Sequence, residues 1–90
     1  PEGMLRLIDK IDNLGLDAMS TGVVLAWATE AFERGMISEK ETLVKPNWGN
    51  YEAYLKMVEF IVEQPNDFYK ALAMGVEYAS SMSFDTYLFK

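Results

Sequence analysis

Apolar residues recur at helical spacing in four separate runs of this 90-residue chain. The clearest run covers about residues 50–63, where large apolar residues fall on one face and charged residues on the other. Three of the four runs stop at a residue that commonly ends helices, namely Gly15, Gly35 or Pro65. No stretch of useful length alternates as a strand does. The sequence therefore predicts an all-α fold, a small bundle of about four helices.

Capping residues refine the helix boundaries. Asp17 and Asn50 stand where side chains cap helix N-termini, and Ser38 is suited to begin a short helical turn. The periodic pattern fails after Ser80, so the last residues are expected to form a tail. The predicted helices span about residues 3–14, 17–34, 50–63 and 66–79.

The helix expected at 17–34 is apolar on more than one side, which is typical of a central helix. Ala18, Gly22 and Ala26 recur every four residues along it, so one of its stripes carries only small side chains. Such a stripe allows close approach to the helix backbone. The approaching group is either another packed helix, the commoner case, or a ligand.

Length and composition exclude several classes of protein. The length indicates that residues 1–90 form a single helical domain or a domain fragment, and a first residue of Pro1 fits a fragment at least as well as a complete protein. The net charge of −6 disfavours nucleic acid as a partner, and no basic cluster serves an anionic membrane. Histidine and cysteine are both absent, which removes disulfides, Cys/His zinc sites and thiol nucleophiles. With no signal peptide and no apolar run long enough to cross a bilayer, we expect a cytoplasmic location.

The stretch from Asp12 to Asp17 is the sharpest candidate site. Asp12 is expected in the last turn of one helix and Asp17 at the start of the next, with Gly15 at the corner between them. A helix N-terminus offers free backbone N–H groups, so this corner would suit a flat heterocycle with amino and carbonyl groups, such as a pterin. An equally physical interpretation is ordinary helix punctuation without a ligand. Nothing in the sequence marks a catalytic residue.

Three blocks carry a family resemblance. They are, in chain order, Asp12-x-x-Gly15-Leu16-Asp17-Ala18 followed by Ser20-Thr21-Gly22 and Ala31-Phe32-Glu33-Arg34-Gly35, then Trp48-Gly49-Asn50-x-Glu52-Ala53, and last Leu72-Ala73-x-Gly75-Val76. In this order and spacing the chain resembles the tungsten-containing aldehyde ferredoxin oxidoreductases. The chain departs from that pattern at Met74, where the family has Glu, and at Gln64-Pro65-Asn66-Asp67, which replaces a Gly-rich turn.

The resemblance implies a much longer enzyme that oxidises aldehydes to carboxylic acids and passes electrons to ferredoxin. Such enzymes hold tungsten, or sometimes molybdenum, between two pterins beside a 4Fe–4S cluster. Asp17 stands where the second, cluster-binding copy of the pterin motif has Cys, so this chain resembles the non-cysteine copy. By that match, Asp12 would hydrogen-bond a pterin ring, and Gly15, Leu16, Asp17 and Ala18 would line it.

We therefore expect a fragment that contributes to one pterin site of a parent enzyme and is inactive, without cofactor, when alone. Its partners would be the rest of the parent polypeptide and, for the parent, ferredoxin. Arg6 and Asp9 stand where some members carry metal ligands, so no metal site is expected in this chain. The alternatives are a non-catalytic helical interaction module and a degenerate paralogue that has lost the cofactor.

Overall fold

The computed structural model describes residues 2–81, which form five helices and their connections and include no strand. The all-α expectation is confirmed. The four long helices begin and end within two residues of the expected ranges, whereas the tail expected at 82–90 lies outside the described residues. The helices are α1 (Glu2–Asn13), α2 (Ala18–Glu33), α3 (Glu39–Thr42), α4 (Tyr51–Glu63) and α5 (Asp67–Ser81).

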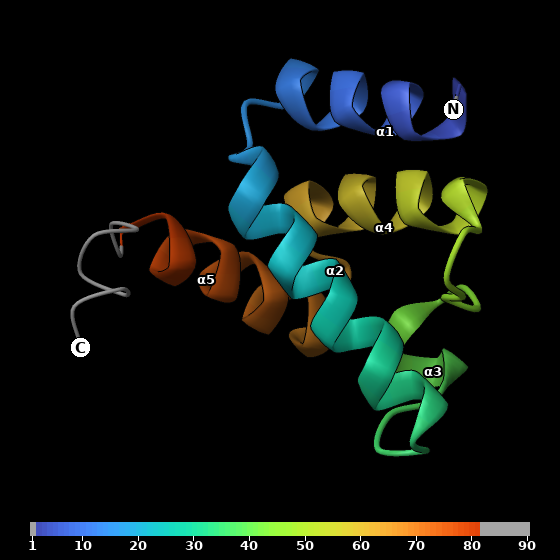
Figure 1. The fold of residues 1–90 in the computed structure, drawn as a ribbon. Helices are drawn as coiled ribbons and strands as arrows, with labels where there is room; N and C mark the ends of the chain where they lie inside the picture. The colour runs from blue at the N-terminus through green and yellow to red at the C-terminus, as the bar shows by residue number, and fades with distance from the viewer. Residues whose placement is uncertain (1, 82–90) are drawn as a thin grey trace, which may run out of the picture.

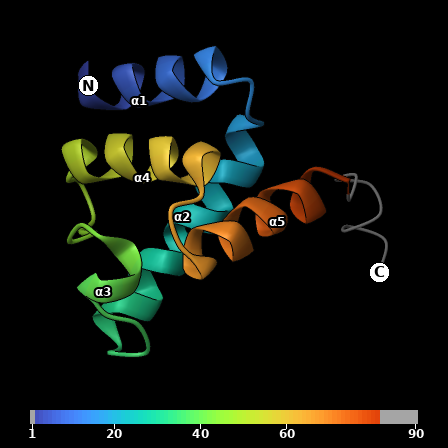
Figure 2. The same ribbon diagram turned by 180° about the vertical axis from the view of Figure 1, so that it is seen from behind.

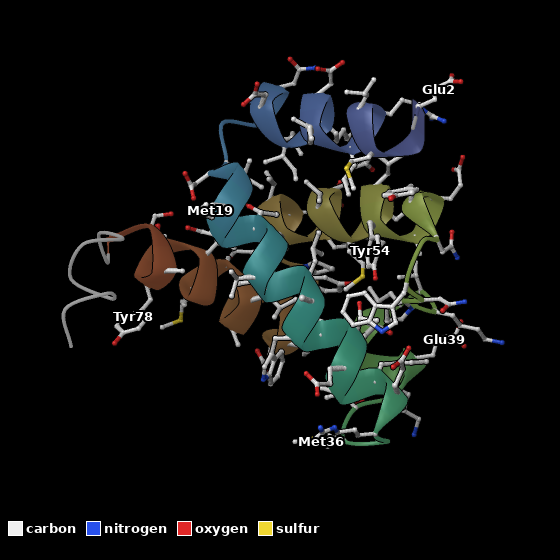
Figure 3. The ribbon with its side chains drawn as sticks, in the orientation of Figure 1. Glu2, Met19, Met36, Glu39, Tyr54 and Tyr78 are labelled. Atoms are coloured by element: carbon white, nitrogen blue, oxygen red, sulfur yellow. The ribbon has the colours of Figure 1, made fainter. Side chains whose placement is uncertain are left out.

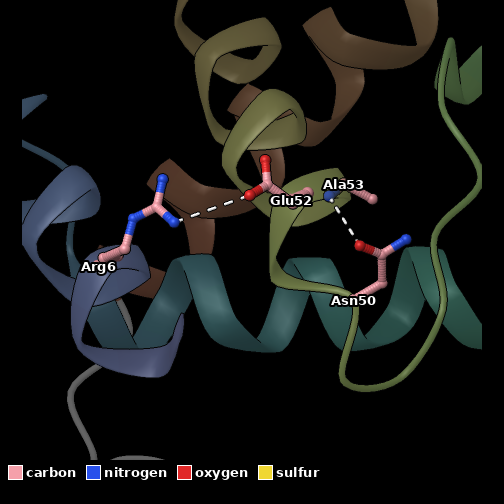
Figure 4. A network of polar contacts seen from close by, with 4 residues as sticks. All are labelled: Arg6, Asn50, Glu52 and Ala53. Carbon is pink, nitrogen blue, oxygen red and sulfur yellow. Dashed lines mark hydrogen bonds and ion pairs between the residues drawn. The ribbon is translucent and has the colours of Figure 1, made fainter. Parts of the chain in front are cut away.

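Side-chain caps explain where the later helices start. Ser38 and Glu41 form a capping box at α3, in which the Ser38 amide donates to Glu41 Oε1 at 2.7 Å. Asn50 Oδ1 accepts the Ala53 amide at 3.3 Å and begins α4 (Figure 4). Asn66 caps α5 in the same way, accepting at 2.9 Å the amide three residues along.

The long helices form two pairs, α1 with α4 and α2 with α5. The helices α1 and α4 lie side by side, and α2 crosses α4, in front of it in Figure 1 and behind it in Figure 2. α2 makes its most extensive contact with α5, and it also touches α1 and α4. α3 is a single turn that packs against α5. No helix among residues 2–81 is long and apolar enough to cross a membrane.

The core lies between α4 and its neighbours. Two buried tyrosines link it to polar groups: Tyr54 Oη lies 2.8 Å from Thr29 Oγ1, and the Tyr69 hydroxyl donates to the Thr42 carbonyl. Burial raises the pKa of Tyr69. The large buried residues of the core are Ile11, Val24, Leu25, Tyr54, Met57, Val58, Ile61, Tyr69, Leu72 and Val76.

Three local features of the packing concern Gly75, Trp48 and α1. A Cβ at Gly75 would lie 3.5 Å from Val24 Cγ2, an ordinary van der Waals distance between α5 and α2. A Trp in a loop before a helix often covers the core, but the Trp48 side chain is more than half exposed and Pro46 is the buried residue of that loop. On α1, Ile11 is buried, Leu7 and Leu14 are partly buried against the core, and Ile8 is 42% exposed.

Candidate cofactor-binding corner

The corner between α1 and α2 begins with a glycine-terminated helix end. Gly15 has φ +76°, its amide donates to the Asp12 carbonyl at 3.0 Å, and the Leu16 amide donates to the Ile11 carbonyl at 3.1 Å. These two bonds form a Schellman motif, whose usual apolar contact joins the residues placed here at Leu16 and Ile11. Leu16 is half-buried and packs against the core. Gly15 and Leu16 are thus explained by helix termination.

Asp17 is explained by helix initiation. Its Oδ2 atom accepts the Ser20 hydroxyl at 2.7 Å and the Ser20 amide at 2.8 Å, which makes it the N-cap of α2. These bonds, the hydroxyl bond first, lower the pKa of the Asp17 carboxyl, so it is ionised at neutral pH. Its charge also complements the positive end of the α2 dipole.

Asp12 has no comparable structural role. It lies in the last turn of α1 with its side chain exposed, and its carboxylate makes no hydrogen bond or ion pair with any residue in the range 2–81. A carboxylate near a helix C-terminus faces the negative end of the helix dipole, which is mildly unfavourable. Of the predicted site residues, Asp12 is the charged one that the fold leaves unused.

The first turn of α2 has backbone amides that are left without an acceptor. The Thr21 amide donates to the Asp17 carbonyl at 2.9 Å, whereas the Ala18 and Met19 amides have no acceptor within the described part of the chain. Ala18 is exposed, and a Cβ at Gly15 would meet no atom within 4 Å. The five predicted residues thus lie in one stretch between the last turn of α1 and the first turn of α2, where the Asp12 carboxylate and two backbone amides have no hydrogen-bond partner among the described residues.

Two buried hydroxyl groups next to the corner were not predicted as site residues. Ser20 Oγ lies 3.2 Å from Ser80 Oγ, which connects the corner to the last turn of α5. Thr21 Oγ1 is fully buried and has no hydrogen-bond partner among the described residues. The Ser20–Ser80 contact spans 60 positions of sequence, so no local pattern could have revealed it.

The corner is suited to organic polar groups rather than to direct metal ligation by this chain. No group of three or more Asp, Glu, His or Cys side chains within residues 2–81 is placed to hold a metal ion. The loop Trp48-Gly49-Asn50, which belongs to the second block of the resemblance, has a structural role at Asn50, which caps α4.

Comparison with known proteins supports the resemblance. The family model described as "Aldehyde ferredoxin oxidoreductase, domains 2 & 3" matches residues 1–85, nearly the whole chain. The chain belongs to the aldehyde ferredoxin oxidoreductase family. No solved structure matches this member significantly.

Three curated relatives indicate the breadth of the family. A Pyrococcus furiosus protein named "Aliphatic sulfonate oxidoreductase, WOR-like subunit" is 36% identical over 64 residues, which are 71% of this chain and 10% of that protein. The tungsten-containing aldehyde ferredoxin oxidoreductase of the same organism is 42% identical over 55 residues, 59% of this chain and 9% of that protein. An uncharacterized protein of Methanocaldococcus jannaschii is 26% identical over 96 residues, 86% of this chain and 15% of its own length. The chain thus spans about a tenth of the relatives it matches.

Proposed function

We propose that this chain is part of a longer oxidoreductase and that its α1–α2 corner contributes to one pterin site. In this proposal the parent enzyme oxidises aldehydes to carboxylic acids and passes electrons to ferredoxin, with a cytoplasmic location. Support comes from family membership and from the two oxidoreductases among the relatives. The sulfonate enzyme among them makes aliphatic sulfonates a second substrate class to assay.

The observation that carries the proposal is the unused carboxylate of Asp12. Gly15, Leu16 and Asp17 would be required at this turn whether or not a ligand binds there. Asp12 is not required by the turn, and like the Ala18 and Met19 amides it has no hydrogen-bond partner among the described residues. A ligand with N–H donors and a carbonyl acceptor would satisfy both kinds of group at once.

The residues of the corner fit a pterin. Asp12 would accept hydrogen bonds from the amino and ring N–H groups, and the α2 amides would donate to the ring carbonyl. Gly15 would let the ring approach the backbone, because it carries no side chain on this open surface. The bound metal–pterin group would supply the two-electron oxidation chemistry, while these residues bind and orient it.

The chain's own composition limits its part in the reaction. It contains no cysteine or histidine, so the ligands of a 4Fe–4S cluster must come from elsewhere in the parent. We therefore assign no catalytic residue to this chain and expect the isolated chain to be inactive.

The first test is to determine the coding sequence beyond both ends of the chain. The proposal expects one reading frame with a Cys-x-x-Cys-x-x-x-Cys run upstream and an Asp-x-x-Gly-Leu-Cys motif downstream. The full polypeptide would then be purified and its tungsten, molybdenum and pterin contents measured. A frame without those cysteines, or a full polypeptide without a pterin, would reject the cofactor function.

Asp12→Asn in the full polypeptide tests the corner itself. We expect a clear loss of bound metal and pterin with little change in thermal unfolding, because the side chain is exposed and makes no hydrogen bond or ion pair with a described residue. Asp9→Asn is the matched control, since Asp9 is also exposed and lies one turn earlier on α1. Equal metal content in both variants and in the unmodified protein would remove Asp12 from the site.

A non-catalytic helical module is the second candidate. It is favoured by the observation that three of the five corner residues have complete structural explanations. It predicts a polypeptide that folds normally and contains neither pterin nor metal, as does a degenerate paralogue. These two differ in length, because only the paralogue retains the remainder of the enzyme.

A further inference from the structure

Helix α2 has an inverted polarity. From Ala18 to Thr29 it carries no charged residue, and its three hydroxyl residues, Ser20, Thr21 and Thr29, all point inward and are buried. Its outward side is apolar instead: the exposed fractions are 60% for Met19, 60% for Val23 and 52% for Trp27. A surface helix normally shows the opposite arrangement. This polarity indicates that the outward side of α2 is made to be covered.

The exposed side of α2 continues onto α5 as one surface. A groove of about 310 Å³ runs between the two helices, and its lining is almost entirely apolar. We call this surface the α2–α5 apolar face. Its members are Met19, Val23 and Trp27 of α2 and Phe68, Ala71 and Gly75 of α5.

The groove has room for a bulky side chain, since a cavity of roughly 150 Å³ already holds a benzene molecule. Elsewhere on the exposed side of α2, Gly22 is exposed, and a Cβ there would meet no atom within 4 Å. No described helix packs on the small-residue stripe at this point. Another helix backbone could therefore approach α2 closely, as small residues allow.

We propose that a helix from the remainder of the parent polypeptide packs along the α2–α5 apolar face. This inference rests on the proposal that a longer polypeptide exists, and it is supported by relatives of which this chain spans only about a tenth. The occupant presents aliphatic or aromatic side chains to the groove, because the groove offers no charge to pair with. A second copy of the chain is a poorer occupant, since each copy carries a net charge of −6.

Oxidative footprinting read by mass spectrometry tests this, because the chain contains matched probes. Met19 and Trp27 lie on the face, whereas Met36 and Trp48 lie in loops and have similar exposed fractions of 69% and 55%. Met19 and Met36 are at opposite ends of α2 (Figure 3). The rates are compared between the 90-residue chain and the full polypeptide.

We expect Met19 and Trp27 to be oxidised at least about fivefold more slowly in the full polypeptide, since packing would reduce their exposed fractions from half to less than a tenth. Met36 and Trp48 should change by less than about twofold. Equal rates for the face probes in the two proteins would overturn the proposal, as would equal protection of all four probes.

A charge on the face provides a second measurement. Val23→Lys in the full polypeptide should return Trp27 oxidation toward the rate of the 90-residue chain, because a lysine cannot pack in an apolar interface without cost. Val62→Lys is the control, since Val62 is also exposed, at 45%, but lies on α4. Equal Trp27 rates in the two variants would contradict the proposal.

The remaining outcomes separate other occupants and the cofactor proposal. Protection already present in the 90-residue chain would overturn the inference. It would indicate a second copy if lost on dilution, or residues 82–90 if independent of concentration. A full polypeptide without pterin in which Met19 and Trp27 are protected would reject the cofactor function and support the docking. A metal-loaded polypeptide in which Met19 and Trp27 are unprotected would support the cofactor function and reject the docking. A reading frame that ends with this chain would also overturn the docking.

Discussion

The two helix pairs of this molecule present opposite chemistry to solvent. Between α1 and α4 lies an open groove lined mostly by charged and polar side chains, with Arg6 paired to Glu52 at 3.7 Å and Lys10 to Glu59 at 2.7 Å. Figure 4 shows the first of these pairs reaching from α1 to the start of α4. Between α2 and α5 lies another open groove, but its lining is almost wholly apolar.

This difference indicates which side of the fragment needs a further packing partner. Charged pairs on the α1–α4 side are well solvated and need no further partner. The α2–α5 apolar face leaves a valine, a methionine and a tryptophan in water, and contiguous exposed apolar surface of this kind usually marks an interaction site. The α1–α2 corner connects a helix of the first pair to a helix of the second (Figure 1).

The largest expected effect separates the floor of the apolar groove from its rim. Leu72→Ala should lower the free energy of unfolding of the 90-residue chain by about 2–5 kcal/mol, because Leu72 is buried beneath the groove. Val23→Ala should change it by less than about 0.5 kcal/mol, because Val23 is on the exposed rim. Urea unfolding followed by circular dichroism measures both. If Val23→Ala costs as much as Leu72→Ala, the rim is already covered in the chain and the contrast between the two sides fails.

Two substitutions on α2 that change the free energy of unfolding in opposite directions, by less than Leu72→Ala, test the inverted polarity of this helix. Thr29→Val should destabilise the chain by about 1–3 kcal/mol, because it leaves the buried Tyr54 hydroxyl without its partner. Thr21→Val should stabilise it by about 1 kcal/mol, because it removes a buried hydroxyl that has no partner among the described residues. Both threonines are fully buried on the same helix, so each controls for the other. Destabilisation by both substitutions would show that Thr21 has an unseen partner.

The helices were predictable because their signals are local. Gly15, Gly35 and Asn50 act within a few residues of themselves, and each ends or begins a helix as expected. The direction in which α2 faces was not predictable, because both of its sides are apolar. On the inward side, Thr29 forms a hydrogen bond with Tyr54, which lies 25 positions away in the sequence. The exposure of Trp48 was not predictable for a related reason, since its environment depends on a loop whose path the sequence pattern does not determine.

The candidate site was predictable only in part. The residues gathered at the corner are those that the motif indicated. Hydrogen bonding then divides them into Asp17, which caps α2, and Asp12, which the fold leaves free. The capping position of Asp17 was predictable from the sequence, whereas the lack of any hydrogen-bond partner for Asp12 needed side-chain geometry. The Ser20–Ser80 contact needs the tertiary fold and has no local signal.

The smallest expected effect concerns the charged groove. The hydrogen bond and charge of Lys10 lower the pKa of Glu59 below its ordinary value of 4.5. Because this pKa is lowered in the folded state, the pair stabilises the chain fully above the ordinary value, and the stabilisation is lost as the pH falls through the lowered one. Glu59→Gln should therefore reduce the free energy of unfolding slightly at pH 7, by less than either threonine effect, and the difference from the unmodified chain should disappear in acid.

Salt distinguishes this pair from packing. Raising the ionic strength to about 1 M should shrink the Glu59→Gln difference at pH 7, because exposed charges are screened within about 3 Å there. Glu63→Gln is the control, since Glu63 lies on the same helix and makes no ion pair with a described residue. The Leu72→Ala difference should not shrink, because apolar burial is not screened by salt. If the Glu59→Gln difference in the free energy of unfolding persists in salt and in acid, Glu59 stabilises the α1–α4 side by packing rather than by charge. The α1–α4 side and the α2–α5 apolar face would then differ only in how much they depend on packing.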